Sequence, residues 1–398
     1  MVSFNYYLKI LDRLVGFYLF LLVILLNPIN KYISKNKNYE KKILVIKLWA
    51  LGDSILLLPT LKLLKRNYPL TEISILVTQQ NAEIFKSSEY IDDVIILNTE
   101  PFTKLFKNIV LTLIYIIKNN YLVTIDAEPF TFFSAVLTRL SLSKITIGFG
   151  NQKIRSFAYD KKIFYKNNEH AIHRYLSLLS PFKINYSNIN LEKISVGLND
   201  YNNINFFIES DINIKKFPII GVYSGPFDNV TERQWPIDRF VVLCDTLLKK
   251  GYQVILIGNK NEEEYIFKSL INKMKYKPIM LAGKTTIKQL AIMMEIIDVF
   301  ISSDSGPIHF ASAMGTPTIA LFGPGSPDTY KPLSKNSIVL YKKLNCGPCI
   351  NGFKGYSKKC SEKICIKSIS LTEVLISLEY ILEKISDTKL EERERDLG

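Results

Sequence analysis

The stretch of residues 301–327, which reads ISSDSGPIHFASAMGTPTIALFGPGSP, constrains the fold of this chain more than any other segment. A short apolar run breaks into a turn of small residues, 304–307, and a helical run follows directly. A second apolar run, 318–322, comes after that helix. Strand, turn, helix and strand make a βαβ unit of a parallel sheet. Because the turn leaves backbone N–H groups unpaired at the positive end of the helix dipole, the segment predicts a phosphate site for a nucleotide-type ligand.

The side chains of this turn fit the same kind of ligand. Gly306 lets an anion approach the backbone closely, Ser305 adds a hydroxyl, and Asp304 is placed to accept a hydrogen bond from a sugar hydroxyl. His309, one of three histidines in the chain, falls in the first turn of the helix. We expect its imidazole to brace the loop rather than to transfer a proton.

Two domains are expected from the length of the chain and from its patterning. A chain of 398 residues is too long for one typical core. β and helical patterns alternate from residue 43 to residue 148 and again from residue 218, and each series is typical of a parallel α/β domain. The sequence therefore predicts an N-terminal segment, a first α/β domain, a linker rich in Asn, Asp and Lys, a second α/β domain, and a C-terminal segment with a final helix. Their predicted bounds are 1–40, 41–184, 185–216, 217–345 and 346–398.

The N-terminal segment contains an unbroken run of 13 apolar residues, 14–26, and lysines follow it between residues 31 and 42. A membrane-spanning helix needs about 20 apolar residues. A signal peptide is disfavoured because no small-x-small cleavage site follows the run. The pattern therefore predicts an anchor helix embedded in one leaflet, with its basic flank at anionic headgroups. A buried or dimerising helix is the alternative.

Charge and cysteine usage bear on the partners of the chain. Its net charge of +14, from 51 basic and 37 acidic residues, predicts an anionic partner. Because lysine is spread along the chain rather than clustered with aromatic residues, nucleic acid is not expected. Cys346, Cys349, Cys360 and Cys365 form a Cys-x2-Cys and a Cys-x4-Cys pair. This spacing predicts a structural zinc site or two disulfides, with free thiols as the alternative. Cys244 lies in an apolar helical pattern and is expected to be a buried small side chain.

Four blocks of the sequence resemble one known family. Residues 301–327 resemble the donor-site signature of glycosyltransferase family 9, the lipopolysaccharide heptosyltransferases and their relatives. Three further segments match the same family in order, and they are 43–64, 233–236 and 281–285. Residues 128–133 depart from the glycine- and leucine-rich stretch that is usual there. The resemblance implies the GT-B fold, with two Rossmann-like domains facing a cleft and a final helix that commonly packs back on the N-terminal domain.

The resemblance also implies an activity. It points to an inverting glycosyltransferase that moves a sugar, with heptose from ADP-heptose as the expected donor, onto a lipid-linked glycan such as the lipopolysaccharide core. Such an enzyme is expected at the cytoplasmic face of the bacterial inner membrane, as a peripheral or monotopic protein. Two alternatives stay open. One is a family member that uses a different nucleotide-sugar, and the other is a non-catalytic protein that binds a nucleotide-sugar or a glycan at the membrane.

Residues outside the signature take expected roles from the same resemblance. Asp53, after the first strand, matches the presumed base that accepts the proton of the acceptor hydroxyl, although an Asp at this place can instead cap the helix. Arg233 matches a Lys or Arg position that contacts the donor diphosphate, and Ser224 is a weaker phosphate contact. Lys284 and Thr285 match a block expected to line the nucleotide site. No Asp-x-Asp pair stands where a metal-dependent transferase would need it, so no cofactor is expected apart from the possible structural zinc.

Overall fold

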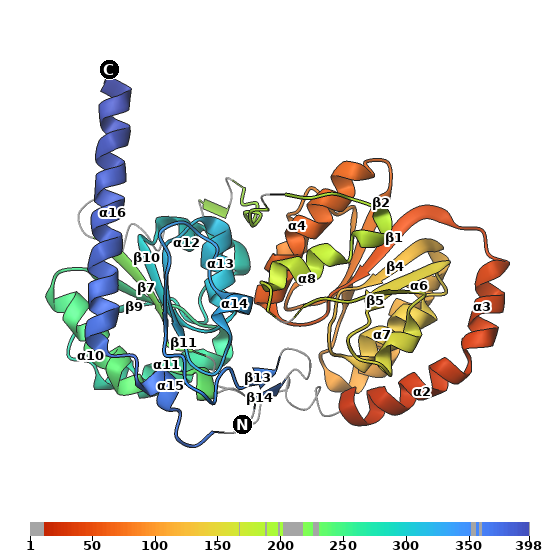
Figure 1. Cartoon of the computed structure of the whole chain (residues 1–398), viewed down its shortest axis with the longest axis horizontal. Helices are drawn as coiled ribbons and strands as arrows, with labels where there is room; N and C mark the ends of the chain where they lie inside the picture. Colours follow the sequence, from red (N-terminus) through yellow and green to blue (C-terminus); the bar gives the residue numbers. More distant parts are fainter. Residues whose placement is uncertain are drawn as a thin grey trace. The chain divides into compact units, whose positions relative to one another are not determined.

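The computed structural model of the chain describes residues 12–166, 168–187, 189–197, 200–201, 218–225, 231–351, 356–357 and 360–397. They form two compact units that divide between Leu191 and Glu192 (Figure 1). Each unit is built on a parallel sheet, so the expected class of two α/β domains is confirmed. Residues 1–11 of the predicted N-terminal segment and residues 202–216 of the predicted linker lie outside the described residues.

The N-terminal unit contains a six-stranded sheet in the order β3-β2-β1-β4-β5-β6, in which every neighbouring pair is parallel. Its strands are β1 (Glu40–Ile46), β2 (Glu72–Thr78), β3 (Asp93–Leu97), β4 (Tyr121–Asp126), β5 (Ile145–Phe149) and β6 (Lys161–Ile163). The chain leaves β1 toward β2 and β3 and then returns to place β4 on the other side of β1. The strand order therefore reverses between β1 and β4, and at such a switch point the loops beyond the carboxyl ends leave room for a ligand.

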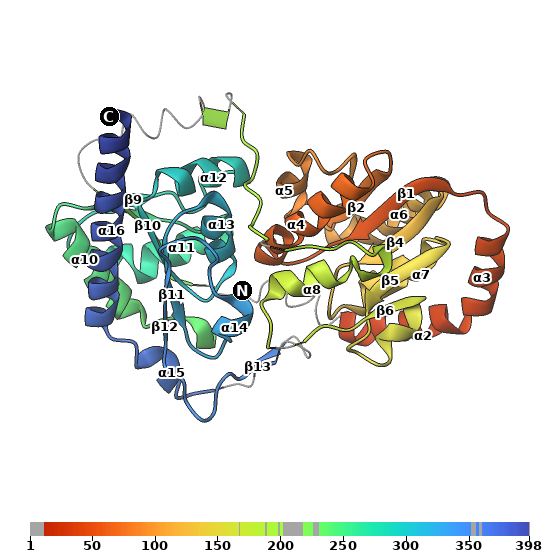
Figure 2. The ribbon, with the colours of Figure 1, turned by 45° about the horizontal axis from the view of Figure 1, so that its top comes forward.

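Helices cover both faces of this sheet. They are α4 (Leu51–Asn67), α5 (Ala82–Lys86), α6 (Leu105–Lys118), α7 (Phe132–Leu140) and α8 (Ala171–Ser177). The connections through α6 and α7 cross the sheet in one direction, whereas the connection through α4 runs in the other. Because crossovers between parallel strands are right-handed, α6 and α7 lie on one face and α4 lies on the opposite face. α8 packs beside α4 (Figure 2).

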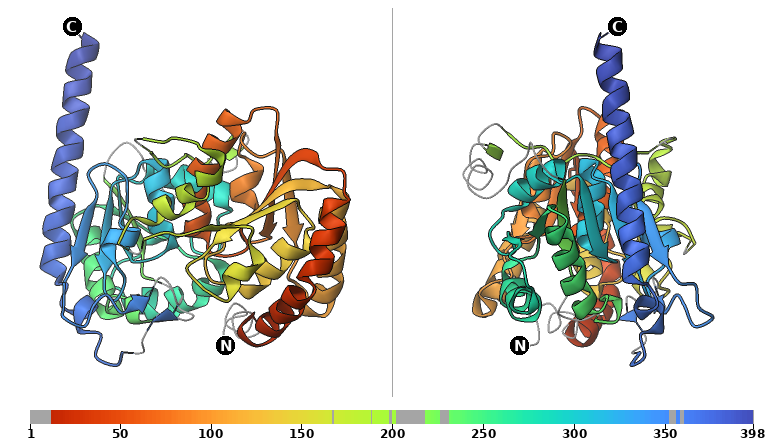
Figure 3. Two further views of the ribbon diagram at one scale, coloured as in Figure 1. Left: turned by 45° about the vertical axis from the view of Figure 1, so that its right-hand side comes forward. Right: turned by 90° about the vertical axis from the view of Figure 1, so that its left-hand side faces the viewer.

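The apolar N-terminal run forms a bent pair of helices rather than one rod. A π-helical turn, Asp12–Gly16, leads into α2 (Phe17–Leu25) and α3 (Asn27–Lys35), which run along the side of the unit (Figure 3). Among the described residues, no single helix is long and apolar enough to cross a membrane. The pair 12–25 and 27–35, bent by 58°, meets that criterion only when the two helices are taken together. One side of α2 packs on α7 through the buried side chains of Phe20 and Val23.

The C-terminal unit repeats the same plan. Its six-stranded parallel sheet has the order β12-β11-β10-β7-β8-β9, so its switch point lies between β7 and β10. The strands are β7 (Ile219–Tyr223), β8 (Gln253–Leu256), β9 (Ile279–Met280), β10 (Val299–Ser303), β11 (Thr318–Phe322) and β12 (Ile338–Tyr341), with a separate antiparallel pair β13 (Ile350–Asn351) and β14 (Tyr356–Ser357). The helices are α10 (Ile237–Lys249), α11 (Lys260–Ser269), α12 (Ile287–Ile296), α13 (Gly306–Met314), α14 (Pro327–Tyr330), α15 (Ile364–Lys367) and α16 (Leu371–Leu397). The βαβ unit predicted from residues 301–327 is confirmed as β10, α13 and β11.

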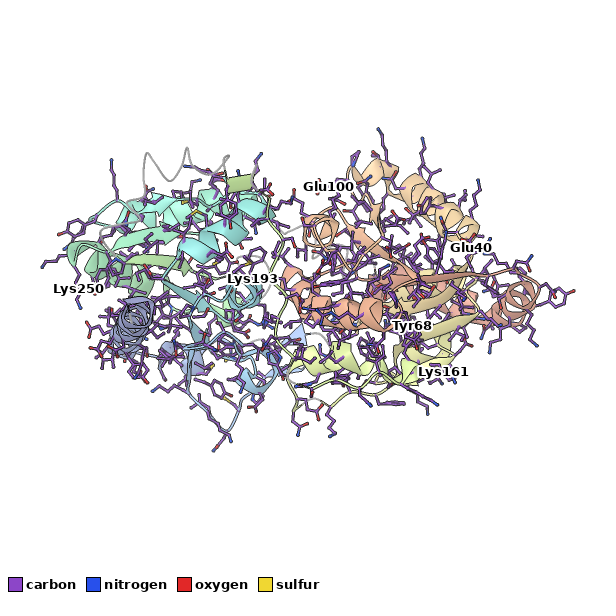
Figure 4. All side chains as sticks on the ribbon, turned by 90° about the horizontal axis from the view of Figure 1, so that it is seen from above. Glu40, Tyr68, Glu100, Lys161, Lys193 and Lys250 are labelled. Carbon is purple, nitrogen blue, oxygen red and sulfur yellow. The ribbon has the colours of Figure 1, made fainter. Side chains whose placement is uncertain are left out.

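The final helix, α16, belongs to the C-terminal unit and packs in its core. Val374, Leu378 and Ile381 are buried in the same core as Trp235 of the C-terminal unit. The indole Nε1 of Trp235 donates to the carbonyl oxygen of Ile369, just before α16, at 2.9 Å. At the surface, Lys250 at the end of α10 (labelled in Figure 4) lies 2.5 Å from the carboxylate of Glu379. Because apolar side chains of α16 pack on α10 and on the sheet, burial rather than this exposed ion pair holds the helix in place.

Leu378→Ala tests this placement. Leu378 is 1% exposed, and its truncation leaves a cavity against α10 and the sheet, so we expect the unfolding free energy of the C-terminal unit to fall by about 2–5 kcal/mol. Ile376→Ala on the same helix is the control, because Ile376 is 61% exposed and its loss should change stability by less than about 0.5 kcal/mol. Urea unfolding measures both, and equal effects would contradict the packing of α16 in this core.

Candidate active site

The turn between β10 and α13 has the geometry of an anion site. Ser305 precedes the helix in an extended conformation and its side chain makes no capping hydrogen bond to the first turn. Its hydroxyl instead lies 3.0 Å from the hydroxyl of Ser302. The first turn of α13 thus has no side-chain cap; Pro307 lacks an N–H, and the N–H of Ile308 donates to the carbonyl oxygen of Ser305 at 3.2 Å. The positive end of this helix lies beyond the carboxyl end of β10.

Asp304 lies deeper in this turn than a residue that binds a sugar hydroxyl at a surface. It is 3% exposed, and its Oδ2 lies 3.5 Å from Nε of Arg233. Gly325, in the loop after β11, closes over it, because a Cβ at this glycine would lie 1.9 Å from that oxygen. Burial raises the pKa of Asp304, and the neighbouring Arg233 opposes this shift. Asp304 therefore holds Arg233 beside the anion site, and the burial of its charged carboxylate lowers the stability of the fold.

Arg233 reaches the site because the residues that follow it are anchored in the core. It ends a 3₁₀ turn, Thr231–Arg233, and Trp235 two residues later is fully buried. The backbone N–H of Trp235 donates to the hydroxyl of Ser303, at the end of β10, at 3.3 Å. Nε of Arg233 is buried and has no hydrogen-bond partner among the described residues. A guanidinium beside a helix N-terminus is suited to bind phosphate oxygens.

Ser224 joins this group from the neighbouring strand. β7 pairs with β10, and Tyr223 lies opposite Ser302, so the residue after β7 comes to the same edge of the sheet as Asp304. Ser224 is 3% exposed, and its hydroxyl also lacks a partner in the part of the chain that the structure describes. Residues 227–230, where the sequence carries an apparent insertion, lie outside the described residues.

The other predicted donor-site residues are more peripheral. His309 is buried in the first turn of α13, and its ring centroid lies 5.9 Å from that of Tyr330 in α14. This contact joins the first turn of α13 to α14, which follows the loop after β11. The expected role of His309 as a brace stays a prediction. Lys284 and Thr285 lie in the turn before α12, which starts with a capping box in which Thr286 is the N-cap. The structure thus brings Ser224, Arg233 and the β10–α13 turn together, and it places Lys284 and Thr285 in a separate turn.

Asp53 lies in the N-terminal unit, in the first turn of α4, and the alternative that it caps this helix is wrong. The N-cap position is occupied by Ala50, with no side-chain cap hydrogen bond. Asp53 is partly exposed, and its carboxylate makes no hydrogen bond or ion pair within the described ranges of the chain. Since the helix does not use this carboxylate, it is available for a proton or a ligand at the switch point of the N-terminal sheet.

Sequence reasoning missed a buried group of charges beside Asp53. Lys47, Asp126, Glu128 and Arg155 are each no more than 4% exposed and are joined by hydrogen bonds. One signal pointed to the group, because residues 128–133 depart from the family pattern. Neighbours that are far apart in the chain, such as residues 47 and 155, could not be paired from the sequence.

The cysteines near the C-terminus are thiols in this structure, and Cys346 is exposed. The Sγ of Cys349 donates to the carbonyl oxygen of Cys346 at 3.0 Å. No cluster of three or more His, Cys, Asp or Glu side chains suited to a metal ion is found among the described residues. A structural zinc at Cys346, Cys349, Cys360 and Cys365 stays a prediction. The expected burial of Cys244 is confirmed, and burial raises the pKa of its thiol to about 12.

Proteins of one family are similar to this chain in sequence and in fold. The model of the family described as glycosyltransferase family 9 (heptosyltransferase) matches residues 113–359. The chain is 27% identical over 357 residues to lipopolysaccharide heptosyltransferase 1 of Campylobacter coli, an alignment that covers 84% of this chain and 97% of that protein. It is 32% identical over 144 residues to lipopolysaccharide heptosyltransferase 2 of Salmonella typhimurium, which covers 34% of this chain and only 41% of that protein. Its fold is similar to that of the E. coli ADP-heptose lipopolysaccharide heptosyltransferase II, with a TM-score of 0.69 and 20% identity over 87% of this chain and 99% of that one.

Asp304→Asn tests whether the buried carboxylate opposes folding. A raised pKa in the folded state means that the carboxylate costs no stability below its ordinary pKa of 3.8, and that the cost grows as the pH rises from there to the raised value. At pH 7 we therefore expect the variant to be more stable than the native protein by about 1–3 kcal/mol, with the difference vanishing near pH 3. Urea unfolding as a function of pH measures this. The control is Asp328→Asn, at an exposed carboxylate on α14, which should change little. If Asp304→Asn is instead less stable than the native protein at pH 7, Arg233 fully compensates the charge.

Proposed function

Because this chain belongs to glycosyltransferase family 9 and is a glycosyltransferase, we propose that it transfers heptose from ADP-heptose to the lipopolysaccharide core. One observation supports the proposal most strongly. The C-terminal unit gathers an arginine, a serine hydroxyl and a helix N-terminus without a side-chain cap at the switch point of its sheet, and the serine hydroxyl and Nε of the arginine make no hydrogen bond in the described chain. Buried polar atoms are normally paired, so this group is suited to an anionic ligand that is not part of the protein.

The diphosphate of a nucleotide-sugar is the anion that best fits this group. Two phosphates need several donors, and Arg233, Ser224 and the N-terminus of α13 supply charged, hydroxyl and backbone donors from adjacent strands. ADP-heptose is proposed as the donor because a similar solved structure is named as an ADP-heptose transferase and the relatives described above are heptosyltransferases. A different nucleotide-sugar remains the alternative, since the base and the sugar would contact side chains outside these motifs.

In the proposed reaction, Asp53 is the general base. Its carboxylate accepts the proton of an acceptor hydroxyl as that oxygen forms a new bond to the anomeric carbon of heptose. The bond from this carbon to the diphosphate breaks at the same time, and ADP leaves with the bonding electrons, so the anomeric configuration is inverted. Arg233 and the helix N-terminus offset the charge that develops on the leaving diphosphate, and no step uses a divalent ion.

A non-catalytic nucleotide-sugar or glycan-binding protein is the competing proposal. Such a protein would still need the residues of the C-terminal unit that bind a diphosphate. It would not need an unpaired carboxylate in the first turn of α4. Asp53 does not cap the helix and has no partner among the described residues, which favours a catalytic role.

Asp53→Asn separates these two proposals. The amide keeps the shape of the side chain but cannot accept the proton, so we expect turnover of ADP-heptose to fall by about 100-fold or more, with donor affinity unchanged. The assay is run in EDTA, since no proposed step uses a metal, and ADP release is measured on a soluble acceptor. Glu89→Gln, the same chemical change at an exposed carboxylate, should retain native activity. Native turnover by Asp53→Asn would exclude Asp53 as the base, and loss of native activity in EDTA would exclude a metal-free reaction.

We also propose that the enzyme works at the cytoplasmic face of the bacterial inner membrane, held by the N-terminal helices in one leaflet. The outer side of α2 and α3 is apolar and exposed, and its residues are Leu14, Val15, Tyr18, Leu19, Leu21, Leu22, Leu25, Leu26, Ile29, Tyr32 and Ile33. A second exposed apolar row lies on α6 and comprises Phe106, Val110, Leu111, Ile114 and Tyr115. Both lie on the same side of the sheet, and Lys37 after α3 donates to the carbonyl oxygen of Ile117 in α6 at 2.5 Å.

Apolar rows with lysines at their ends favour an anionic membrane surface over a protein partner. Lys31, Lys35 and Lys41 follow the apolar run, whereas Lys42 is ion-paired with Glu40 and Glu72 in the sheet. Each basic residue near anionic headgroups adds about 1 kcal/mol of attraction. Because Phe20 and Val23 on the inner side of α2 are used by the core, the helix can keep its place on α7 while its outer side enters the leaflet. A lipid-linked acceptor would then be met at the surface where it resides.

The double variant Leu22→Glu/Leu25→Glu tests this anchor without uncovering the core. Removal of residues 1–36 would be less informative, because it would also remove Phe20 and Val23 from their packing on α7. Leu22 and Leu25 are 54% and 77% exposed, so the variant should fold and bind ADP-heptose normally. Binding to vesicles with anionic phospholipid should fall by about tenfold or more, since each buried leucine contributes roughly 1.5–3 kcal/mol.

The control is Leu70→Glu, at a leucine that is 95% exposed and lies after α4 rather than on the N-terminal helices. Co-sedimentation with vesicles measures binding, and transfer to a membrane-embedded acceptor measures its consequence. Native vesicle binding by the double variant would exclude α2 as the membrane contact.

A further inference from the structure

Two loops meet at the switch point of the N-terminal sheet. The loop after β1 spans Lys47–Ala50 and leads into the helix that carries Asp53. The loop after β4 carries Glu128. Because β1 and β4 pair with Ile46 opposite Asp126, both loops leave the sheet at the same level and side by side.

Glu128 binds the β1–α4 loop through one carboxylate oxygen. Its Oε1 accepts hydrogen bonds from Nζ of Lys47 at 2.9 Å, from the backbone N–H of Leu48 at 2.8 Å and from that of Trp49 at 2.8 Å. Nζ of Lys47 also donates to the carbonyl oxygen of Trp49 at 2.6 Å. The Glu128 side chain is almost fully buried, so these contacts are not screened by water.

Glu128 is itself held from the other side. Its backbone N–H donates to Oδ1 of Asp126 at 2.9 Å, and its carbonyl oxygen accepts from the guanidinium of Arg155. That guanidinium is also 2.6 Å from Oδ2 of Asp126, which accepts from the hydroxyl of Tyr159 at 2.6 Å. Two cations and two anions therefore form one buried group, in which the Glu128 carboxylate is the member that binds the β1–α4 loop.

The loop needs such support because its own sequence does not provide it. Ala50 has a φ of 65°, in the left-handed region that residues other than glycine rarely adopt. It also occupies the N-cap of α4, where an alanine offers no side-chain acceptor. Glu128, from the loop after β4, supplies an acceptor for the β1–α4 loop, and it holds the backbone N–H groups four and five residues before Asp53. A shift of the loop would therefore move the first turn of α4 and the Asp53 carboxylate with it.

We propose that Glu128 is a positioning residue for the transfer reaction, whose carboxylate fixes the β1–α4 loop and thereby the direction of the Asp53 carboxylate. This rests on the proposed role of Asp53 as the base. Glu128 does not touch the substrates. Its replacement should reduce turnover without weakening the binding of ADP-heptose, because the residues proposed to bind the diphosphate belong to the C-terminal unit.

Glu128→Gln tests the proposal in combination with Asp53→Asn. The amide cannot neutralise the buried Lys47, so the loop should shift and kcat should fall by about 10- to 100-fold with an unchanged KM for ADP-heptose. If Glu128 acts through Asp53, adding Glu128→Gln to Asp53→Asn should cost less than about threefold more. A purely structural role would instead reduce kcat by the same factor in both backgrounds, and that result would overturn the proposal.

The same set of variants separates this proposal from the proposed function. If Asp53→Asn keeps native turnover, the assigned base is wrong. If Asp53→Asn is inactive while Glu128→Gln retains native turnover, only the positioning role is wrong. Asp160→Asn is the control, because Asp160 accepts from the N–H of Thr146 at 3.0 Å in the same unit but does not contact this loop. It should lower stability and leave kcat unchanged at temperatures where the protein is folded.

A second variant covers the case in which Glu128→Gln does not fold. Lys47→Gln removes the cation and leaves the two backbone donors to Glu128, so it should fold and reduce kcat by about 3- to 10-fold, again only when Asp53 is present. Amide hydrogen exchange at Leu48 and Trp49 should accelerate by about tenfold in either variant that folds, because their acceptor is weakened. Native exchange rates together with native kcat in Lys47→Gln would overturn the proposal.

Discussion

The parallel pairing of β1 with β4, and of β7 with β10, is the constraint on which both functional groups depend. In each sheet the chain builds outward in one direction and then returns to the other side of its first strand. Right-handed crossovers then place the helices that follow the two central strands on opposite faces. The loops beyond the carboxyl ends diverge, and the backbone and side-chain groups that end there are not covered by either helix. Asp53 and the β10–α13 turn both occupy such positions.

The two switch points are stabilised in different ways. In the N-terminal unit Lys47, Asp126, Glu128 and Arg155 are paired with one another through hydrogen bonds, although Nη1 of Arg155 has no partner among the described residues. In the C-terminal unit, the hydroxyl of Ser224 and Nε of Arg233 make no hydrogen bond in the described chain, and Nε of Arg233 is ion-paired with Asp304. Burial raises the pKa of Asp304, as it does that of Glu128 in the N-terminal unit. A network of paired buried charges gives rigidity, which a base needs. Buried polar atoms without hydrogen bonds can instead bind an anion. The difference agrees with a base on one unit and a charged donor on the other.

The N-terminal helices show how one apolar segment serves two environments. Phe20 and Val23 pack on α7, and Asp12 accepts hydrogen bonds from the backbone N–H groups of Phe132 and Phe133 at the start of that helix. The segment is thus tied to the fold through one side and through the half-buried carboxylate of Asp12, while its other side remains apolar and exposed. The apolar run in the sequence predicted either a membrane helix or a buried helix. In the structure it is a bent pair of helices with one side buried against α7 and the other side exposed.

The amino-acid sequence by itself determined the class of the fold, the βαβ unit at residues 301–327 and the family. These follow from local signals, namely the spacing of apolar runs, small-residue turns and the motifs that contain Asp53, Arg233 and Asp304. The tertiary structure alone decided that α16 packs beside Trp235, that Ala50 rather than Asp53 occupies the N-cap position of α4, and that Glu128 binds Lys47. Each of these depends on contacts between residues that are distant in the chain or on the backbone angles of a turn. A pattern read along one sequence carries no information about which buried charge meets which, because that is set by the order of strands in the sheet.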